Sequence, residues 1–450
     1  MSASTSKLAS IVTAPSQESV AEIGRRARAA SRLLAKLSNE HRNKVLQAVA
    51  QAIEQAKARI LEANAEDCRA AEPAVKAGTM SAVMLARLGD QRKLAHMPAY
   101  VRSVAALPDP LGKRLAATEL DEGLLLFKES CPLGVIGVVF ESRPEVISQV
   151  AALTLKSGNA VILKGGSEAA RTNDVIVSVW RKCLETFPAV PADAIQLLHT
   201  REEFTELLSR DRDVDLIVPR GSYELVHFVM RNSRIPVLGH GEGICHVYVD
   251  RAADLDKAIA VTVDAKVQGP AICNAAETLL VHRAVAKEFL PKVAARLIEA
   301  GVEIRGCPET IALLGSIPVV PATERDWATE YSDLILSIKV VDDEDAAIAH
   351  INQYGSRHTD AVVTEDSATA RKFMDEVDSA GVFQNASTRF SDGYNYGLGA
   401  EIGISNSKLH ARGPMGLEGL TTYKYKLFGN GHTVADYSKG LKQFKHRPIL

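Results

Sequence analysis

One cysteine stands where a reactive thiol could face a cleft. Cys273 follows the break formed by Gly269 and Pro270 and precedes an apolar run, Thr278 to Val281, which is typical of a strand. A helix is expected over about residues 253–267, so Cys273 is predicted to lie on the loop between that helix and the strand. A thiolate on such a loop can act as a nucleophile. The alternative is a buried and inert cysteine, which is the commoner state of a free cysteine.

Two predicted strand-to-helix turns combine glycine with a cation and a hydroxyl. They contain, in order, Lys164, Gly166 and Ser167, then Arg220, Gly221 and Ser222. The lysine can bind a ribose or a phosphate, and glycine lets the backbone approach a ligand. The free N–H groups of the following helix can bind a pyrophosphate. Each turn alone could be an ordinary connection, and no GxGxxG fingerprint is present. Two such turns at the carboxyl ends of strands favour a nucleotide crevice.

A third polar segment runs from Lys408 to Gly416. It brings together a lysine, His410 and Arg412 between small residues. An arginine can bind a carboxylate or phosphate with two parallel hydrogen bonds, so the segment could form an anion site. The alternative interpretation is an ordinary surface loop.

The pattern of apolar runs predicts how these motifs are positioned. From Val135 onward short apolar runs alternate with helical periodicity, which indicates parallel, doubly wound sheets. Strands of a first domain are expected over residues 135–140, 160–163, 195–198, 215–218 and 235–238, with helices over 145–157, 169–186, 202–209 and 223–232. Strands of a second domain are expected over residues 246–249, 278–281, 334–341 and 360–363. The chain is therefore expected to contain two α/β domains, with Cys273 early in the second.

The two ends of the chain have different patterns. Residues 17–107 are expected to be helical, since Val45, Val49 and Ile53 recur at helical spacing. Runs at 118–120 and 124–128 predict a hairpin, and 421–427 predicts a further strand followed by a polar tail.

Bulk composition excludes several classes of function. The 450 residues carry a net charge of −2, and no basic stripe indicates nucleic-acid binding. The six cysteines have no paired spacing, which argues against a zinc site or a disulfide framework and favours a reducing compartment. No apolar run approaches the roughly 18 residues of a membrane span. The N-terminus also lacks the apolar segment of a signal peptide, so a cytoplasmic location is expected. The cysteine spacing leaves no expectation of a bound metal.

Four blocks of this sequence resemble a known family. The segments 132–144 and 155–169 are similar to the cofactor half of the aldehyde dehydrogenase superfamily. Within it, Phe140–Pro144, Cys273–Val281 and His410–Lys424 resemble the γ-glutamyl phosphate reductases, also called glutamate-5-semialdehyde dehydrogenases. The resemblance extends from about residue 17 to the end of the chain. It implies an aldehyde-dehydrogenase-like α/β fold with two doubly wound domains and a small β oligomerisation element.

The resemblance also implies domain boundaries. The cofactor-binding domain would comprise residues 1–110 and 132–239, and the catalytic domain residues 240–416. Residues 111–131 and 417–450 would supply the oligomerisation strands and the C-terminal tail, which predicts a homo-oligomer.

Specific residues acquire roles through the same resemblance. Cys273 corresponds to the thiol nucleophile, Lys164 to the adenosine-ribose contact, and Gly221 and Ser222 to the pyrophosphate site. Glu330 corresponds to the group that binds the nicotinamide ribose.

Two departures from the wider superfamily are informative. Hydrolytic aldehyde dehydrogenases carry a glutamate just before a Leu-Gly-Gly motif, and Val237 stands at that position here. Without that base the enzyme should hydrolyse its thioester poorly and should exchange the acyl group with phosphate instead. The superfamily's oxyanion asparagine is also replaced, by Ser142 or Arg143 depending on the alignment. The backbone N–H of Cys273 is the remaining oxyanion donor.

The implied reaction is the NADPH-dependent reduction of γ-glutamyl phosphate to glutamate-5-semialdehyde, the second step of proline biosynthesis. A separate glutamate 5-kinase would supply this substrate, and a transient contact with it is possible. Arg412, Arg220 and His410 are the candidates for binding the phosphate group. NADPH is expected because Ser167 stands where NAD-using relatives carry a glutamate, although Glu168 could turn inward and supply that charge. Two alternatives remain: another acylating enzyme, for example one that uses coenzyme A, or a non-catalytic binding member of the superfamily.

Overall fold

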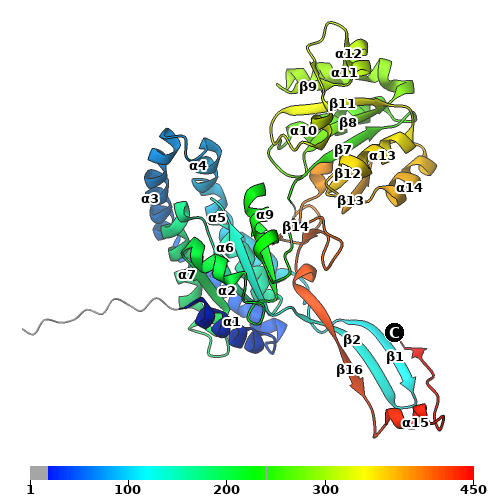
Figure 1. The fold of residues 1–450 in the computed structure, drawn as a ribbon. Helices are drawn as coiled ribbons and strands as arrows, with labels where there is room; N and C mark the ends of the chain where they lie inside the picture. Colours follow the sequence, from blue (N-terminus) through cyan, green and yellow to red (C-terminus); the bar gives the residue numbers. More distant parts are fainter. Residues whose placement is uncertain (1–18, 240, 450) are drawn as a thin grey trace, which may run out of the picture.

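The computed structural model describes residues 19–239 and 241–449, which form two α/β domains and an extended β arm (Figure 1). The arm projects from the region between the two domains. The expected fold class is confirmed.

The sheet of the first domain is parallel and reverses its winding direction at its third strand. It contains β3 (Val135–Phe140), β4 (Ala160–Lys164), β5 (Ile195–Leu198) and β6 (Leu216–Arg220) in the order β5-β4-β3-β6. All six residues of β3 are buried, because helices cover both faces of the sheet and require a continuous apolar run. The winding reverses between β3 and β6, and such a reversal opens a crevice at the carboxyl ends of the strands.

The expected strand at 235–238 is largely wrong. A single parallel bridge, Ile217 to Val237, is all that forms there. Pro236 accepts a hydrogen bond from the Ile217 backbone N–H, at 2.9 Å, but cannot donate one, so the ladder stops after one rung.

Helices surround this first sheet. The expected N-terminal helical region is confirmed, and Ser19, Ser38, Ser81 and Asp90 cap four of its helices by accepting backbone N–H groups. The helices are α1 (Val20–Leu34), α2 (Asn39–Gln55), α3 (Lys57–Lys76), α4 (Ala82–Leu88), α5 (Gln91–Ala106), α6 (Val146–Lys156), α7 (Ala170–Leu184), α8 (Arg201–Leu207) and α9 (Tyr223–Asn232).

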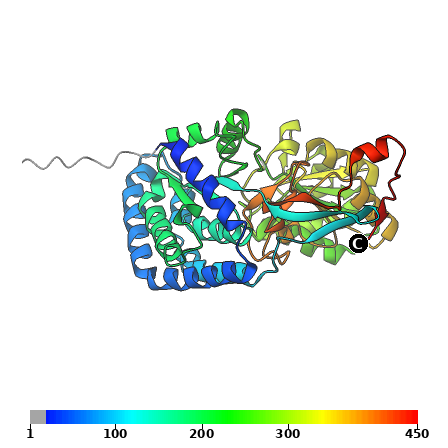
Figure 2. The same ribbon diagram turned by 90° about the horizontal axis from the view of Figure 1, so that it is seen from below.

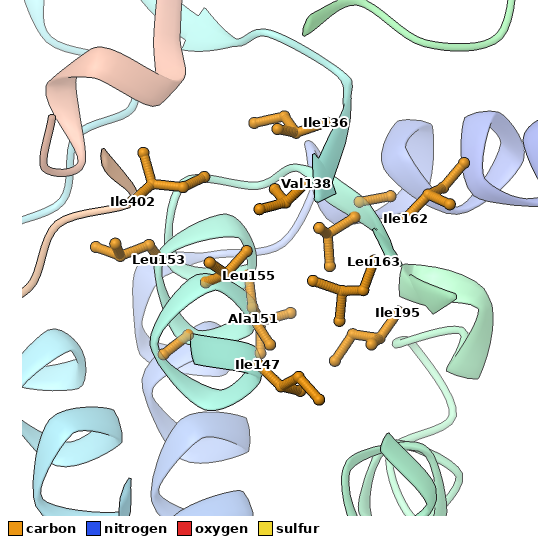
Figure 3. Close-up of a cluster of buried hydrophobic side chains, with 14 of the residues drawn as sticks. Ile136, Val138, Ile147, Ala151, Leu153, Leu155, Ile162, Leu163, Ile195 and Ile402 are labelled. Atoms are coloured by element: carbon orange, nitrogen blue, oxygen red, sulfur yellow. The ribbon is translucent and has the colours of Figure 1, made fainter. Parts of the chain in front are cut away.

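The core of the first domain includes a segment from the far end of the chain. Ile136 and Val138 of β3 lie in one buried cluster with Ile147 and Leu153 of α6, and Ile402 lies in the same cluster (Figure 3). Ala400, Met415, Leu417 and Leu420 also belong to it. The chain therefore returns to the first domain before residue 416, where the sequence analysis expected the second domain to end.

The second domain contains a seven-stranded parallel sheet. Its strand order is β10-β9-β11-β8-β7-β12-β13. The strands are β7 (Cys245–Val249), β8 (Ala276–His282), β9 (Glu303–Gly306), β10 (Val320–Pro321), β11 (Ile335–Val341), β12 (Thr359–Val363) and β13 (Gly381–Gln384). The helices are α10 (Leu255–Val267), α11 (Arg283–Glu299), α12 (Pro308–Leu314), α13 (Glu344–Tyr354) and α14 (Ser367–Glu376). The four strands expected from sequence are present, whereas β9, β10 and β13 were not expected.

The arm is a four-stranded sheet made from both ends of the polypeptide. It joins β1 (Arg114–Asp121), β2 (Leu124–Pro132), β16 (Thr421–Phe428) and β17 (Arg447–Pro448) in the order β16-β2-β1-β17. Both ribbon views show β2 and β16 side by side (Figure 2). The expected hairpin and C-terminal strand are confirmed. The expected polar tail is wrong in part, because it contains α15 (Val434–Ser438) and adds β17 to the sheet.

Two short strands connect the arm to the domains: β14 (Gly403–Ser405) and β15 (Gly413–Met415) pair antiparallel in the returning segment. Within residues 19–239 and 241–449, no helix is long and apolar enough to cross a membrane.

Candidate active site

Cys273 lies on the loop that the sequence predicted. The loop connects the end of α10 at Val267 to the start of β8 at Ala276, and Cys273 itself is half-buried. The Cys245 thiol donates to the Cys273 carbonyl oxygen at 3.4 Å. A side chain on Gly243 would overlap that same carbonyl, so only glycine fits there. The loop is thus fixed from the amino-terminal edge of the sheet, where β7 and β8 begin.

Other thiols are poorer candidates for the nucleophile. Burial raises the pKa of the Cys68, Cys131 and Cys183 thiols. Burial also raises the pKa of Cys245 well above its ordinary value, and Asp360 adds to the effect. These four thiols are therefore more strongly held in the protonated and unreactive form.

An acidic group from the loop before β11 binds Gly243, the residue that packs against the Cys273 carbonyl. Glu330 accepts a hydrogen bond from the Gly243 backbone N–H, at 2.9 Å. Burial raises the pKa of the neighbouring Glu242, and the charge of Glu330 raises it further. The structure therefore brings Glu330 beside the predicted nucleophile, although 57 positions separate them in sequence (330 minus 273).

A buried ion pair that the sequence analysis missed supports this arrangement. Lys266 lies seven residues before Cys273 and Glu277 four after it, and their Nζ and Oε2 atoms are 2.7 Å apart. Glu277 also accepts the Ser332 backbone N–H at 3.3 Å. Both charged side chains are fully buried, so removing either partner would leave an uncompensated charge. The pair ties both ends of the Cys273 loop to the segment that carries Glu330.

The predicted cofactor residues lie at the carboxyl ends of β4 and β6. Lys164 ends β4, and its Nζ donates to the Gly165 carbonyl at 2.5 Å. Burial lowers the pKa of Lys164, and the nearby Glu168 opposes that shift. Ser222 caps α9 by accepting the Leu225 N–H, directly after Gly221. Both turns flank β3, at the point where the winding of the sheet reverses.

A carboxylate occupies the amino end of α9. Glu141 accepts a hydrogen bond from the Ser222 N–H at 2.8 Å. A Cβ added to Gly221 would lie 2.5 Å from Glu141 Oε2, so glycine is what permits this close approach. The N–H groups here accept an anionic oxygen from the protein itself, as they would accept a phosphate oxygen. The turn therefore presents N–H groups to an anion, and Glu141 supplies that anion in this structure.

A second carboxylate bends over the other turn. Both the backbone N–H and the hydroxyl of Ser142 donate to Glu168 Oε1, each at 2.7 Å. A side chain on Gly166 would collide with the Glu168 carboxylate. Ser142 has a φ of 45°, in the left-handed region that few non-glycine residues adopt. Because the Ser142 hydroxyl donates to Glu168, the expectation that Ser142 contacts substrate is weakened.

Arg220 binds the returning segment 400–420, which packs into the core of the first domain. It ends β6, and its Nη1 donates to the carbonyl of Glu401 at 3.4 Å. Burial lowers the pKa of Arg220, while Glu401 and the Cys273 thiolate oppose that shift. The like charge of Arg143 lowers the pKa of Arg220 further. Arg220 is thus a half-buried cation whose charge interacts with Cys273.

His410 and Arg412 lie in a different cavity. A cavity of about 440 Å³ is lined by parts of residues 107–113 and 397–419, including both side chains but not Cys273. Arg412 donates to the Asp378 carbonyl at 2.9 Å and to its carboxylate at 3.1 Å. His410 Nε2 donates to the Gly419 carbonyl at 2.8 Å. An intramolecular carboxylate therefore already binds the guanidinium that sequence analysis ranked first for phosphate.

Sequence reasoning missed two polar residues on the catalytic side. Arg389 lies in η4 (Thr388–Phe390), and its Nε donates to Gln268 Oε1 at 2.8 Å. Asn274 follows Cys273 and donates to the Ser391 carbonyl at 2.9 Å. Part of a signal was present, since six of the eight residues 385–392 are polar, but the strand before them, β13, was not expected. Among the described residues no cluster of three or more metal-ligating side chains occurs.

Comparison with known proteins agrees with this geometry. The model of the aldehyde dehydrogenase family matches residues 1–305. A γ-glutamyl phosphate reductase of Synechococcus sp. is 54% identical over 94% of this chain and 93% of its own length. One from Nostoc sp. is 54% identical over 95% of this chain and 98% of its own. The crystal structure of the γ-glutamyl phosphate reductase from Thermotoga maritima covers 92% of this chain and 100% of its own, with 40% identity and a TM-score of 0.88.

These likenesses extend through the Cys273 loop, both β-strand turns and the arm. Family membership implies a nicotinamide cofactor. The chain therefore belongs to the aldehyde dehydrogenase family, within its branch of γ-glutamyl phosphate reductases.

Proposed function

We propose that this protein reduces γ-glutamyl phosphate to glutamate-5-semialdehyde and inorganic phosphate, with NADPH as the reductant, in proline biosynthesis. The observation that carries the proposal is the half-buried Cys273 beside Arg220 of the first domain and the Glu330 segment of the second. The curated relatives at 54% identity bear the name of this activity.

The thiol of Cys273 carries the acyl group. Its thiolate attacks the acyl carbon, the bond from that carbon to the phosphate oxygen breaks, and phosphate leaves with the bonding electrons. A bound nicotinamide supplies the hydride that reduces the resulting thioester. The thiohemiacetal then collapses, the C–S bond breaks, and the sulfur recovers its electron pair as the aldehyde departs. The Cys273 backbone N–H is the proposed donor to the developing oxyanion.

The cofactor is proposed to bind along the carboxyl ends of β4 and β6. Lys164, Gly166 and Ser167 would bind its adenosine half, and Gly221 and Ser222 its pyrophosphate. Glu330 would bind the nicotinamide ribose. The preference for NADPH is supported by the exposed Ser167 and by the two hydrogen bonds that direct Glu168 toward Ser142. Lys164 is then the neighbouring charge for a 2′-phosphate.

Arg220 is the first candidate for binding the phosphate group of the substrate. Its interaction with the Cys273 thiolate and its burial support this choice. Arg143, whose charge interacts with that of Arg220, is the second candidate, ahead of Ser142. His410 and Arg412 stay predictions as phosphate ligands, since they line the separate cavity.

The test exploits the missing base at Val237. In the reverse direction, glutamate-5-semialdehyde and NADP should form a thioester on Cys273 that water attacks slowly. Losing a general base typically costs about 10² to 10⁴ in rate. NADPH should therefore form continuously only with phosphate or arsenate, and otherwise as a burst of about one equivalent per site.

Three outcomes decide the proposal. Sustained turnover without phosphate, yielding free glutamate, would identify a hydrolytic enzyme. Turnover that requires coenzyme A would identify another acylating dehydrogenase. Cys273→Ser should abolish both the burst and the turnover. Cys307→Ser should keep both, because this half-buried thiol follows β8 in the sequence, whereas Cys273 precedes it.

The protein is also proposed to form a homo-oligomer in the cytoplasm and to receive its labile substrate from a separate glutamate 5-kinase by transient contact. Exposed apolar side chains on β16 support the first of these. They are Tyr423, Tyr425, Leu427 and Phe428.

A further inference from the structure

Arg389 presents a guanidinium whose hydrogen bonds are incomplete. Its Nε donates to Gln268, the C-cap residue of α10. Its Nη1 is buried and has no partner in the part of the chain that the structure describes. Gly269 makes room for this group, since a Cβ there would lie 3.1 Å from Arg389 Nη2. A buried donor without an acceptor costs about 1–3 kcal/mol, so its retention calls for an explanation.

Arg389 lies close enough to the nucleophile to interact with its charge. Burial lowers the pKa of Arg389, and the Cys273 thiolate is the largest influence in the opposite direction. Arg389 comes from the second domain, whereas Arg220 comes from the end of β6 in the first. Two cations from different domains therefore act on Cys273.

Asn274, the residue after the nucleophile, has a buried hydrogen-bond acceptor without a donor in the described part of the chain. Asn274 donates its amide N–H to the Ser391 carbonyl at 2.9 Å, directly after η4. Its Oδ1 is buried, and it accepts no hydrogen bond from any residue within 19–239 and 241–449. A donor without an acceptor and an acceptor without a donor thus lie on two segments that pack together beside Cys273.

A ligand that satisfies both atoms must offer an acceptor to Arg389 Nη1 and a donor to Asn274 Oδ1. The head group of an α-amino acid does so, because its carboxylate and ammonium are attached to one carbon. The fully ionised acyl phosphate offers acceptors alone and would leave Asn274 Oδ1 unpaired. Carboxylate binding by arginine is also charge-assisted and can be bidentate.

We propose that Arg389 binds the α-carboxylate, and Asn274 the α-ammonium, of the amino-acid head group of the substrate. This inference rests on the proposed function and deepens it by assigning the end of the substrate that does not react. Arg220 is then left for the phosphate, on the side of Cys273 that belongs to the first domain.

The reverse reaction separates the two anions, because the amino-acid aldehyde and phosphate bind as different molecules. Arg389→Gln should raise the KM for glutamate-5-semialdehyde about 10- to 100-fold, the value of a hydrogen bond to a charged group. The KM for phosphate should change less than about two-fold. With pentanal, which lacks the head group, the variant and the wild type should have similar kcat/KM. Arg296→Gln, at an exposed arginine of α11, is the charge-matched control.

A substrate-independent measurement accompanies this test. Iodoacetate and iodoacetamide alkylate the same thiol, but iodoacetate alone carries a carboxylate. Arg389→Gln should lower the iodoacetate-to-iodoacetamide rate ratio at Cys273 several-fold while the iodoacetamide rate is retained, which also shows that the loop is folded. Arg389→Lys should give an intermediate ratio, because it keeps the charge but loses the planar fork.

The outcomes are distinguishable. An unchanged alkylation ratio, or a KM increase for phosphate in place of the aldehyde, would overturn the inference. A lowered ratio in a protein whose wild type does not oxidise glutamate-5-semialdehyde would refute the proposed function and leave Arg389 as a carboxylate-binding residue.

Discussion

At the scale of single residues, two carboxylates occupy the proposed cofactor edge. Glu141 binds the amino end of α9 and Glu168 binds Ser142, so each accepts N–H groups that a dinucleotide would otherwise approach. Glu141 overlaps the proposed pyrophosphate position, whereas Glu168 lies beside the proposed ribose position.

The first prediction concerns cofactor choice. The wild type should have a higher kcat/KM with NADPH than with NADH, because Ser167 places no charge near the 2′-phosphate. Ser167→Glu should shift the ratio toward NADH by at least about ten-fold, since one carboxylate near a phosphate costs more than 1.4 kcal/mol at short range. Steady-state kinetics with both cofactors measures it. Equal values in the wild type would contradict the prediction and would indicate that Glu168 supplies the charge.

The second prediction concerns Glu141. Glu141→Gln removes the anion that competes for the Ser222 N–H, so the Kd for NADPH should fall several-fold. Calorimetric titration measures this Kd directly. Glu224→Gln is the matched control, since Glu224 is exposed in the first turn of the same helix and removes an equal charge. Similar changes in the two variants would show that only the overall charge matters.

The site residues differ in how readable they were from sequence. Cys273 and Lys164 could be proposed from sequence because their position relative to one strand is a local property. The environment of Arg389 and Arg412 is not local, since their partners Gln268 and Asp378 lie 121 and 34 residues away. Only folding reveals that a carboxylate binds Arg412, whereas Nη1 of Arg389 has no partner among the described residues.

At the scale of elements, a continuous apolar run decided whether a strand was predicted. β3 and β8 carry six and seven consecutive buried residues and were located to within about two residues. β9 has four residues, as the predicted β5 does, but Ile304 is its one large apolar residue, and β10 has two residues, so neither shows an apolar run. The bridge at Val237 failed as a strand because Pro236 cannot donate to a neighbouring strand.

The third prediction concerns α13 and acid stability. His350 packs against the rings of Trp327, His246 and Tyr354, and burial lowers its pKa to about 2, with further contributions from His246 and Lys339. Below about pH 6.5 the unfolded chain takes up a proton that the folded chain refuses. The free energy of unfolding should therefore decrease as pH falls, by about 2 kcal/mol between pH 6.5 and 5.

A variant isolates this contribution. His350→Gln should remove most of the decrease, as followed by urea unfolding at several pH values. His96→Gln, at an exposed histidine of α5, should leave it unchanged. An identical pH dependence in wild type and His350→Gln would show that other groups control acid unfolding.

At the scale of the whole molecule, segments distant in sequence hold the parts together. Residues 400–420 leave the second domain, enter the first core through Ile402 and Met415, and continue into β16 of the arm. Arg220 contacts the Glu401 carbonyl on this returning segment. The sequence indicated the three parts, but not this return, because the buried residues there are too few to mark a domain.

The arm carries the last prediction. β16 is an edge strand whose second neighbour is missing within the described chain, and it exposes Tyr425, Leu427 and Phe428. A long apolar edge on a soluble protein is a surface for pairing with another chain. We expect the wild type to sediment as a homo-oligomer at micromolar concentration, since burying these side chains stabilises association at about 25 cal/mol per Å² of apolar surface. Leu427→Asp should shift the sedimentation coefficient toward the monomer, because a carboxylate buried at an interface has no partner there. Val83→Asp on α4 is the control, since both side chains are 56% exposed and the change in charge is the same. A monomeric wild type, or a Leu427→Asp variant that sediments as the wild type does, would show that this strand does not mediate assembly.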